Sequence, residues 1–344
     1  MEAHFYVSSS PHIRDRESIR KIMFSVVVAL IPALVGAVYF FGARALWITV
    51  VSVLTAIITE GLIQKLRKVP VTISDGSAVV TGILLAYNLP AGCPYWLPVI
   101  GSFFAIAIGK QAFGGLGYNP MNPALLGRAF LLASWPVRMT SEWVAPRGGT
   151  LSGITTWTGA TPLNLLKQAR KVIHHKELYT DNKIQESFRI LSDISSSYSA
   201  LFWGKVGGCL GETSVILLLI GALYLLYKRY IGLEIPVTYI GVVALLAWAF
   251  NGTKGLFTGD PLFHILSGGL ILGAFFMATD MVTTPVTVKG KLIFGAGCGV
   301  LTVFIRQFGG YPEGVSYSIL LMNLTTPIID RYVKPKIFGH KKVE

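Results

Sequence analysis

A polar stretch at residues 156–166, TWTGATPLNLL, holds the side chains best suited to covalent chemistry in this chain. Thr161 stands before Pro162, and an amphipathic run follows. Since threonine is a good N-cap and proline is favoured at the first helical position, the stretch predicts the start of a helix. A helix N-terminus also binds anions through its unpaired N–H groups. A phosphate esterified to Thr161 would lie in that field, and Gly159 and Ala160 leave room for a bulky group.

Other hydroxyl groups in the same stretch compete as acceptors, namely those of Thr155, Thr156 and Thr158. Local sequence therefore leaves three interpretations open: the start of a helix, a piece of linker, or a site of chemistry. The composition of the whole chain and its predicted helices help to decide among these interpretations.

Composition places the chain in a membrane. Hydrophobic residues make up 52% and charged residues 14%, whereas a soluble domain has about 25% charged residues. The net charge is +13, but the basic residues flank apolar segments, which is typical of membrane topology. No basic stripe with interleaved aromatic residues is present, so we expect the lipid bilayer, and no nucleic acid, as a partner.

Cysteine and histidine spacing predicts no metal site. The three cysteines, Cys93, Cys209 and Cys298, are isolated and form no C-x-x-C pair. Such spacing supports no iron–sulfur cluster, zinc site or c-type haem. The histidines likewise show no ligand spacing.

Ten apolar segments are candidates for membrane-spanning helices, which need about 20 apolar residues each. They are residues 22–41, 46–64, 77–90, 95–113, 121–137, 211–228, 235–250, 262–279, 291–308 and 314–330. The third segment is short and ends at Pro90, and the eighth contains a glycine pair and ends at Asp280. Both are predicted to be broken or half-length helices, which membranes tolerate where protein covers the irregular backbone.

The distribution of lysine and arginine predicts the orientation. With the N-terminus in the cytoplasm, 17 basic residues fall on the inner side and 3 in the short outer loops. This bias follows the positive-inside rule. Both termini are then cytoplasmic, and the long loop at 138–210 is external.

An internal repeat is indicated by KQAFGG at 110–115 and RQFGG at 306–310, each following an apolar segment. With five spans in each half, the two copies face opposite ways. Such inverted repeats occur in many transporter folds, where broken helices meet near the midplane. The alternative is chance similarity between glycine-rich apolar sequences.

The whole chain resembles one family. T-G-A-T at 158–161 is similar to the flavin-attachment motif of the D subunit of Rnf electron-transport complexes and of the related B subunit of the sodium-pumping NADH:quinone oxidoreductase. The similarity continues, in order, through SSPHIR (9–14), YFFGARAL (39–46), EGLIQKLRK (60–68), SDGSAVVTGILLA (74–86), GKQAFGGLGYNPMNPALLG (109–127), LSGGLILGAFFMATDMVT (266–283), KGKLIFGA (289–296), RQFGGYPEGVSYSILLMN (306–323) and PIIDRYVKPKIFGHKK (327–342). Thr158 stands where serine is also common in the motif.

The resemblance implies a flavoprotein subunit of an ion-translocating complex. FMN would be bound to Thr161 through a phosphoester, with Thr158, Gly159, Ala160 and Pro162 around it. A second, non-covalent flavin (riboflavin or FMN) would lie among the membrane helices. The implied partners are the A, B, C, E and G subunits of the complex and a flavin transferase. No nicotinamide fingerprint follows a predicted strand, so NAD and ferredoxin would react on partner subunits, in an oxidoreductase that this chain does not complete alone.

The implied architecture is an all-α membrane protein of the inner membrane of a prokaryote, similar to ammonium and urea transporters. Its parts are a cytoplasmic segment (1–21), a first five-helix repeat (22–137), the external flavin-bearing loop (138–210), a second repeat (211–330) and a cytoplasmic tail (331–344).

Polar residues within or beside the apolar segments are functional candidates by default. Asp75, before the short third segment, and Asp280, at the end of the broken eighth one, are the first candidates for ion coupling. Capping of helices or pairing near the interface is the alternative. Asn119, Asn122 and Asn323 lie near glycine and proline breaks. They could hydrogen-bond a flavin ring or satisfy backbone groups that the breaks leave free.

Three function classes remain. The first is the flavin-carrying electron-transfer subunit. The second is a membrane channel or transporter with no redox role, which would have no need of T-G-A-T in an external loop. The third is a structural anchor for redox partners with a vestigial flavin site.

Overall fold

The computed structural model describes residues 17–141, 143–144, 146, 161–174, 177, 179–195, 198–212, 214–252, 255–311 and 313–335. Within these residues the regular structure is helical, apart from one isolated β-bridge between Pro90 and Cys209. The all-α prediction is therefore confirmed for the described part of the chain.

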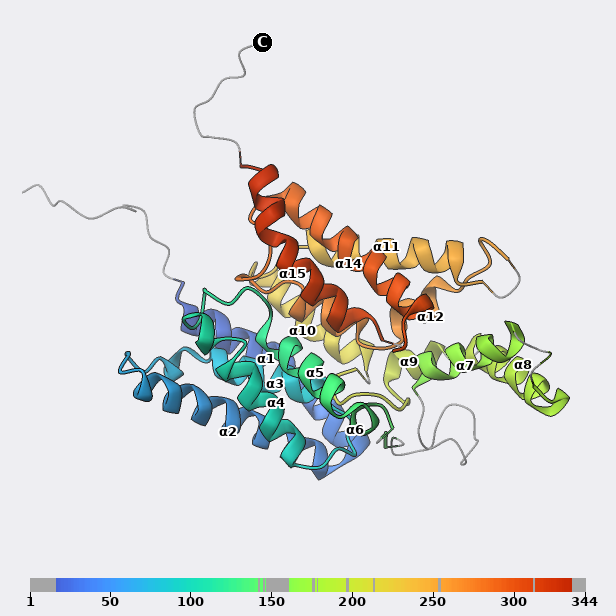
Figure 1. Ribbon diagram of the computed structural model, residues 1–344, viewed down its shortest axis with the longest axis horizontal. Helices are drawn as coiled ribbons and strands as arrows, with labels where there is room; N and C mark the ends of the chain where they lie inside the picture. Colours follow the sequence, from blue (N-terminus) through green and yellow to red (C-terminus); the bar gives the residue numbers. More distant parts are fainter. Residues whose placement is uncertain are drawn as a thin grey trace, which may run out of the picture.

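The helices form two groups joined by a peripheral segment (Figure 1). The first group contains α1 (Ile19–Phe41), α2 (Ala43–Leu66), α3 (Ser77–Tyr87), α4 (Trp96–Ala107), α5 (Pro123–Ser134) and the short α6 (Pro136–Thr140). The second contains α10 (Val215–Tyr227), α11 (Glu234–Phe250), α12 (Pro261–Leu266), α13 (Leu270–Leu272), α14 (Val288–Phe308) and α15 (Val315–Tyr332). Between the two groups in the sequence come α7 (Pro162–His174), α8 (Asp181–Ser195) and α9 (Tyr198–Trp203).

Four helical segments are long and apolar enough to cross a membrane, and the helical membrane prediction is confirmed at this level. They are Ile19–Phe41, Ala43–Leu66, Trp96–Phe113 and Val288–Phe308, with mean hydropathy between 1.3 and 2.4. Shorter apolar helices include α3, α5, α10 and α11. Many large apolar side chains on these helices are exposed, as Tyr39, Leu223 and Leu245 are, which is the pattern expected of a surface that faces lipid.

The eighth predicted segment is broken, as its glycine pair indicates. α12 ends at Leu266, and Gly268 takes a left-handed backbone conformation with φ +68°. The chain then continues as α13 and a π-helix at Gly273–Met277. π-helical turns inside helices frequently mark functional sites. The third predicted segment is likewise short, since α3 ends at Tyr87.

The two groups have corresponding internal packing. α2 packs on α3 and α4, and α4 on α5; in the second group α11 packs on α12 and α14, and α14 on α15. The groups meet where α1 packs on α10 and α5 on α15. Gly221 of α10 allows this approach, since a Cβ atom there would lie 2.0 Å from the carbonyl oxygen of Ala29 in α1. Small residues at helix interfaces let backbones pack closely in membranes.

The predicted loop at 138–210 contains three helices in its described part. α7 and α8 pack against each other as a pair, and they project from the helical body in Figure 1. In the same view α7, α8 and α9 lie at one end, on the right, while the first turn of α1 and the last turn of α15 lie toward the left.

Candidate functional site

Thr161 is the N-cap of α7, as the T-P sequence predicts. α7 begins at Pro162, and the backbone N–H of Asn164 donates to Thr161 Oγ1 over 3.4 Å. The Thr161 side chain is buried, at 4% exposure. Thr158, Gly159 and Ala160 lie outside the described residues. The amphipathic run packs as expected, because Leu163, Leu166 and Ala169 of α7 are buried.

Basic residues of α7 attach it to the second helical group. Lys167 Nζ donates to the carbonyl oxygen of Gly309, just after α14, and Arg170 donates to the carbonyl oxygen of Asn251, just after α11. Leu163 contacts the helix break directly, because a Cβ atom on Gly268 would lie 2.7 Å from Leu163 Cδ1. Burial lowers the pKa of Arg170 to about 10. These contacts place Thr161 beside the break between α12 and α13.

Thr161 lines a pocket, here called the Thr161 pocket. Aromatic side chains form part of its wall, and Arg128 and Glu313 supply charge; the lining residues are Arg128, Leu132, Met139, Thr140, Trp143, Thr161, Asn164, Tyr311, Glu313, Ser316 and Tyr317. The rings of Tyr311 and Tyr317 stack with centroids 6.0 Å apart. The pocket therefore combines a helix N-terminus, which favours an anion, with stacked aromatic rings, which offer a flat surface.

Arg128 in α5 holds several elements together around this pocket. Its Nη1 donates to Asn88 Oδ1 over 2.6 Å, and its Nη2 donates to a carboxylate oxygen of Glu313. Nη1 also lies 3.5 Å from Glu212 Oε1 as an ion pair. Arg128 is 6% exposed, so its charge requires the acidic partners that the structure supplies.

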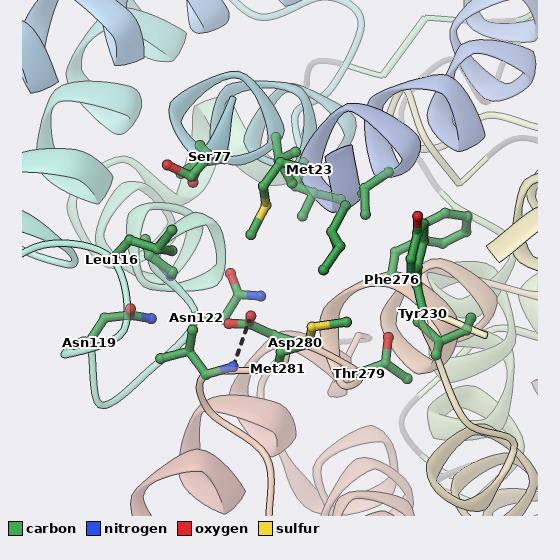
Figure 2. Close-up of a pocket in the computed structure, with 18 of the residues that line it drawn as sticks. Met23, Ser77, Leu116, Asn119, Asn122, Tyr230, Phe276, Thr279, Asp280 and Met281 are labelled. Carbon is green, nitrogen blue, oxygen red and sulfur yellow. Dashed lines mark hydrogen bonds between the residues drawn. The ribbon is translucent and has the colours of Figure 1, made fainter. Parts of the chain in front are cut away.

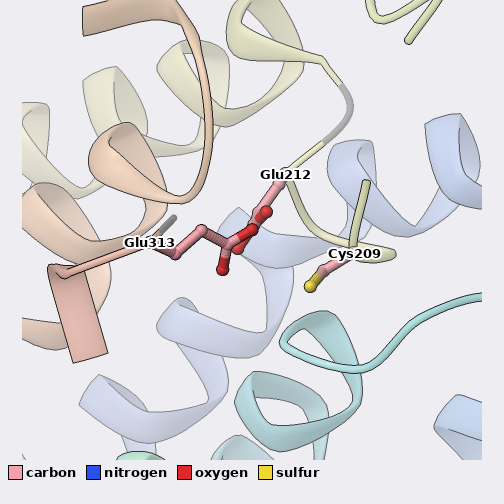
Figure 3. A group of neighbouring side chains, drawn as sticks. All are labelled: Cys209, Glu212 and Glu313. Atoms are coloured by element: carbon pink, nitrogen blue, oxygen red, sulfur yellow. The ribbon is translucent and has the colours of Figure 1, made fainter. Parts of the chain in front are cut away.

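A compact group of three side chains adjoins Arg128 (Figure 3). Ligand atoms of Cys209, Glu212 and Glu313 all lie within 4.8 Å of one another. Figure 3 shows the two carboxyl groups pointing toward each other and the Cys209 sulfur to one side. Cys209 and Glu212 come from the segment before α10, and Glu313 from the turn before α15.

A second pocket, here called the Asn119 pocket, lies between the two helical groups (Figure 2). α1 contributes Ile22, Met23 and Val26; α3 and its surroundings contribute Ser77, Val80, Thr81, Leu84 and Lys110; the segment before α5 contributes Leu116, Asn119, Asn122 and Pro123; and the second group contributes Leu225, Tyr230, Ile231, Phe275, Phe276, Thr279, Asp280, Met281 and Val282. Three of the five polar residues predicted near the helix breaks, Asn119, Asn122 and Asp280, thus meet in one pocket.

Asn119 has an unused acceptor in this pocket. Its Nδ2 donates to the carbonyl oxygen of Met121 over 3.1 Å, while its buried Oδ1 has no hydrogen-bond partner among the described residues. Phe275, Phe276 and Met23 provide apolar walls. A free acceptor beside apolar walls could bind a ring that presents an N–H edge.

Asn122 and Asn323 join the two groups at the π-helix. Asn122 Oδ1 caps α5 by accepting from Ala124 N–H over 3.0 Å, and its Nδ2 donates to the carbonyl oxygen of Met277 over 3.4 Å. With its amide oriented to satisfy both ends, Asn323 accepts from Asn122 N–H over 3.1 Å and donates to Ile319. Asn323 does not line the Asn119 pocket; it fixes a residue that does.

Asp75 has a different position from Asp280. Its Oδ1 accepts from the N–H and the hydroxyl of Ser77 over 2.8 and 2.6 Å, which caps α3. Ser77 in turn lines the pocket and accepts a hydrogen bond from Lys110 Nζ over 2.6 Å. Lys110 is also bonded to both carboxylate oxygens of Glu60, at 2.7 and 2.9 Å. The capping alternative therefore describes Asp75. Asp280 lines the pocket, and its carboxylate oxygens also accept from the N–H of Val282 over 3.4 Å and from the hydroxyl of Thr283 over 3.3 Å.

Sequence reasoning missed the acidic pair beside Arg128. Glu212 and Glu313 are single acids at the ends of apolar segments, and no local spacing joins them. The internal repeat gives a partial signal for Glu313 alone. Glu313 follows the second copy, RQFGG, much as the pocket residue Asn119 follows the first copy.

The fold and the two pockets define a class: a helical membrane protein with broken helices at the junction of two helical groups and a buried threonine on a peripheral helix. Comparison with known proteins identifies the family. Residues 6–339 match the NQR2, RnfD, RnfE family, and the chain belongs to it.

Similar relatives cover the whole chain. The D subunit of a proton-translocating ferredoxin:NAD(+) oxidoreductase complex from Clostridium ljungdahlii is 51% identical over 98% of this chain and 97% of its own length. The D subunit of a Na(+)-translocating ferredoxin:NAD(+) oxidoreductase complex from Acetobacterium woodii is 47% identical over 100% of this chain and 98% of its own. The D subunit of an ion-translocating oxidoreductase complex from Salmonella newport is 36% identical over 98% and 99%.

Proposed function

We propose that this protein is the D subunit of an ion-translocating ferredoxin:NAD⁺ oxidoreductase complex. End-to-end similarity to two proteins of that description, and to the D subunit of an ion-translocating oxidoreductase complex, carries the proposal. The chain contributes one flavin site on its external segment and one among the membrane helices, while ferredoxin and NAD react on other subunits, which we expect to be the A, B, C, E and G subunits. The protein is thus one part of an oxidoreductase that requires its partners for turnover.

Thr161 carries FMN through a phosphoester in this proposal, attached by a flavin transferase. The N-terminus of α7 favours the phosphate, and the Thr161 pocket offers aromatic surface beside the same hydroxyl. The bound flavin would supply the redox chemistry, and the protein would hold its phosphate, orient its ring and shield it from water.

Covalent attachment is tested on a denaturing gel viewed under ultraviolet light. Protein expressed with the transferase should show flavin fluorescence, which Thr161→Val should abolish. Thr156→Val is the matched control and should keep the fluorescence, because it removes a neighbouring hydroxyl that lies outside the T-G-A-T motif. A wild-type band without fluorescence contradicts the assignment, as does a Thr161→Val band that still fluoresces.

A second, non-covalent flavin occupies the Asn119 pocket in this proposal. The unused Asn119 Oδ1 and the apolar walls support it. After acid extraction, Thr161→Val protein should still release flavin, quantified per chain by chromatography. Adding Asn119→Leu should lower that amount, because the substitution removes the free acceptor and fills part of the pocket. An unchanged amount would place the second flavin elsewhere.

The membrane arrangement proposed is ten spans in two inverted five-helix repeats, with both termini cytoplasmic and residues 138–210 external in a prokaryotic inner membrane. Support comes from the corresponding packing of the two groups and from the bias of basic residues. A tag inserted near Lys176 should react with an impermeant reagent on intact spheroplasts. Reaction only after permeabilisation contradicts this orientation.

Asp280 is the main candidate for ion coupling, since it combines a carboxylate with a position in the Asn119 pocket. In this proposal Asp75 has an indirect role: it holds Ser77, which lines the Asn119 pocket. Asp280→Asn should reduce ion transport per electron transferred in the reconstituted complex, whereas Asp75→Asn should chiefly lower stability. If Asp280→Asn leaves the number of ions transported per electron unchanged, the Asp280 carboxylate has no role in ion coupling. The channel alternative predicts ion flux without any redox partner.

A further inference from the structure

Two acidic side chains share one close arginine beside the Thr161 pocket. Glu212 is 7% exposed and Arg128 is 6% exposed. Arg128 forms ion pairs with both Glu212 and Glu313. Because a buried charge without a partner is strongly destabilising, one guanidinium group balances one of the two carboxylates, and the other requires a cation or a proton.

The geometry between the carboxyl groups favours a proton. A carboxylate oxygen of Glu212 and one of Glu313 lie within 4.8 Å of each other, and Figure 3 shows the two carboxyl groups side by side. Two ionised carboxylates this close repel each other, whereas a protonated carboxyl group can donate to an ionised neighbour. Two carboxyl groups in contact share a proton for the same reason elsewhere.

Arg306 is a second buried cation near the pair, and its charge acts on both acids. Arg306 directs its guanidinium group to the carbonyl oxygens of His264 and Ser267, at 2.7 and 3.3 Å, and has no ion pair with either acid. Cys209 and Tyr317 carry no positive charge in either protonation state, so neither can balance a carboxylate. Among the described residues, Arg128 is therefore the one cation paired with the acids.

An oxygen without a hydrogen bond and an adjacent pocket distinguish the pair from a closed structural cluster. Glu212 Oε1 lies 3.5 Å from Arg128 Nη1 as an ion pair but accepts no hydrogen bond from the described residues, although its side chain is more than nine-tenths buried. Gly269 lies against this oxygen, since a Cβ atom there would be 2.6 Å from it. Glu313 and Arg128 also line the Thr161 pocket, so the pair has a polar path to Thr161.

We propose that Glu212 and Glu313 hold one proton between them at neutral pH, at a proton-binding site that opens through Glu313 to the Thr161 pocket. A proton that leaves this site breaks one carboxyl O–H bond, and the negative charge left behind stays beside Arg128. The site consists of this chain's own side chains, so it is present whether or not Thr161 carries a flavin.

Infrared spectroscopy of the full-length protein tests the site. The C=O band of a protonated carboxyl group should be present at neutral pH and should shift in D₂O. Glu212→Gln and Glu313→Gln, both similar in shape to the native residue, should each abolish it, since the remaining carboxylate then pairs with Arg128. Either variant suffices if the other does not fold. Arg128→Gln should increase the band about twofold, because two carboxyl groups beside no cation each take a proton.

Asp280→Asn is the control, because that carboxyl group lies in the other pocket; the band assigned to the pair should remain. Thr161→Val protein, which lacks the covalent flavin of the proposed function, should also keep it. A wild-type protein without the band overturns the site, as does a band that survives in both glutamine variants. Loss of the band on adding Na⁺ at constant pH would show that a metal ion occupies the pair, and this too overturns the proposal.

Discussion

The buried ion pair of Lys110 and Glu60 gives a sharp test of how the first helical group is held together. Both side chains are 1% exposed, and Lys110 Nζ has three close oxygen partners, the two of Glu60 and Ser77 Oγ. Removing one member of such a pair leaves a buried charge without a partner, which costs roughly 3–5 kcal/mol. At 1.36 kcal/mol per factor of ten, the unfolding equilibrium should shift by roughly two to four powers of ten.

The assay is unfolding of purified protein in mixed detergent micelles, followed by circular dichroism. Lys110→Met and Glu60→Leu should each lower the free energy of unfolding by that amount. The double variant Glu60→Leu with Lys110→Met should cost less than either single change, because no charge is left unpaired. If the single changes each cost less than about 1 kcal/mol, or if their effects simply add, the pair is not coupled and the reasoning fails.

Three further predictions follow from contacts described above. Gly221→Val should lower the unfolding midpoint because it forces α1 and α10 apart, whereas Gly241→Val, whose Cβ meets nothing within 4 Å, should be tolerated in the same assay. Burial and the hydrogen bond to Asp260 raise the pKa of Tyr198 to about 12 from 10.0, so wild-type stability should fall between pH 10 and 12; Tyr198→Phe should show a flatter pH profile there. Arg170→Ala should speed limited proteolysis around α7, because it removes a hydrogen bond that attaches this helix; an unchanged cleavage rate would show that the attachment is dispensable.

Local chemistry explains which features the sequence predicts well. Thr161 and Pro162 start α7 because capping depends only on neighbouring backbone groups. The glycine pair at 268–269 breaks the eighth segment for an equally local reason, a left-handed φ at Gly268. Membrane character follows from composition alone.

Features built from distant segments are less predictable. Asn323 is a sequence candidate for contact with a flavin ring, and in the structure it holds Asn122, a contact between α15 and the start of α5. Glu212 and Glu313 meet only because the two helical groups pack together, and neither carries a local signal. Asp75 and Asp280 have similar positions beside broken segments, and both accept local hydrogen bonds, Asp75 from Ser77 and Asp280 from Val282 and Thr283. Asp280 alone of the two lines the Asn119 pocket, a placement that depends on the packing of the two helical groups.

The two pockets lie on one rigid element. Asn122 and Pro123, at the start of α5, line the Asn119 pocket, while Arg128 and Leu132 of the same helix line the Thr161 pocket. With a rise of about 1.5 Å per residue, α5 separates Pro123 from Arg128 by roughly 7 Å along its axis and Asn122 from Leu132 by roughly 15 Å. The length of α5 therefore sets the distance between the two pockets. A single inserted residue would advance everything beyond it by about 1.5 Å and turn it by about 100°, carrying Arg128 away from its acids. The positions of the two pockets therefore constrain the length of α5. The same constraint does not apply to the length of the peripheral segment before α10.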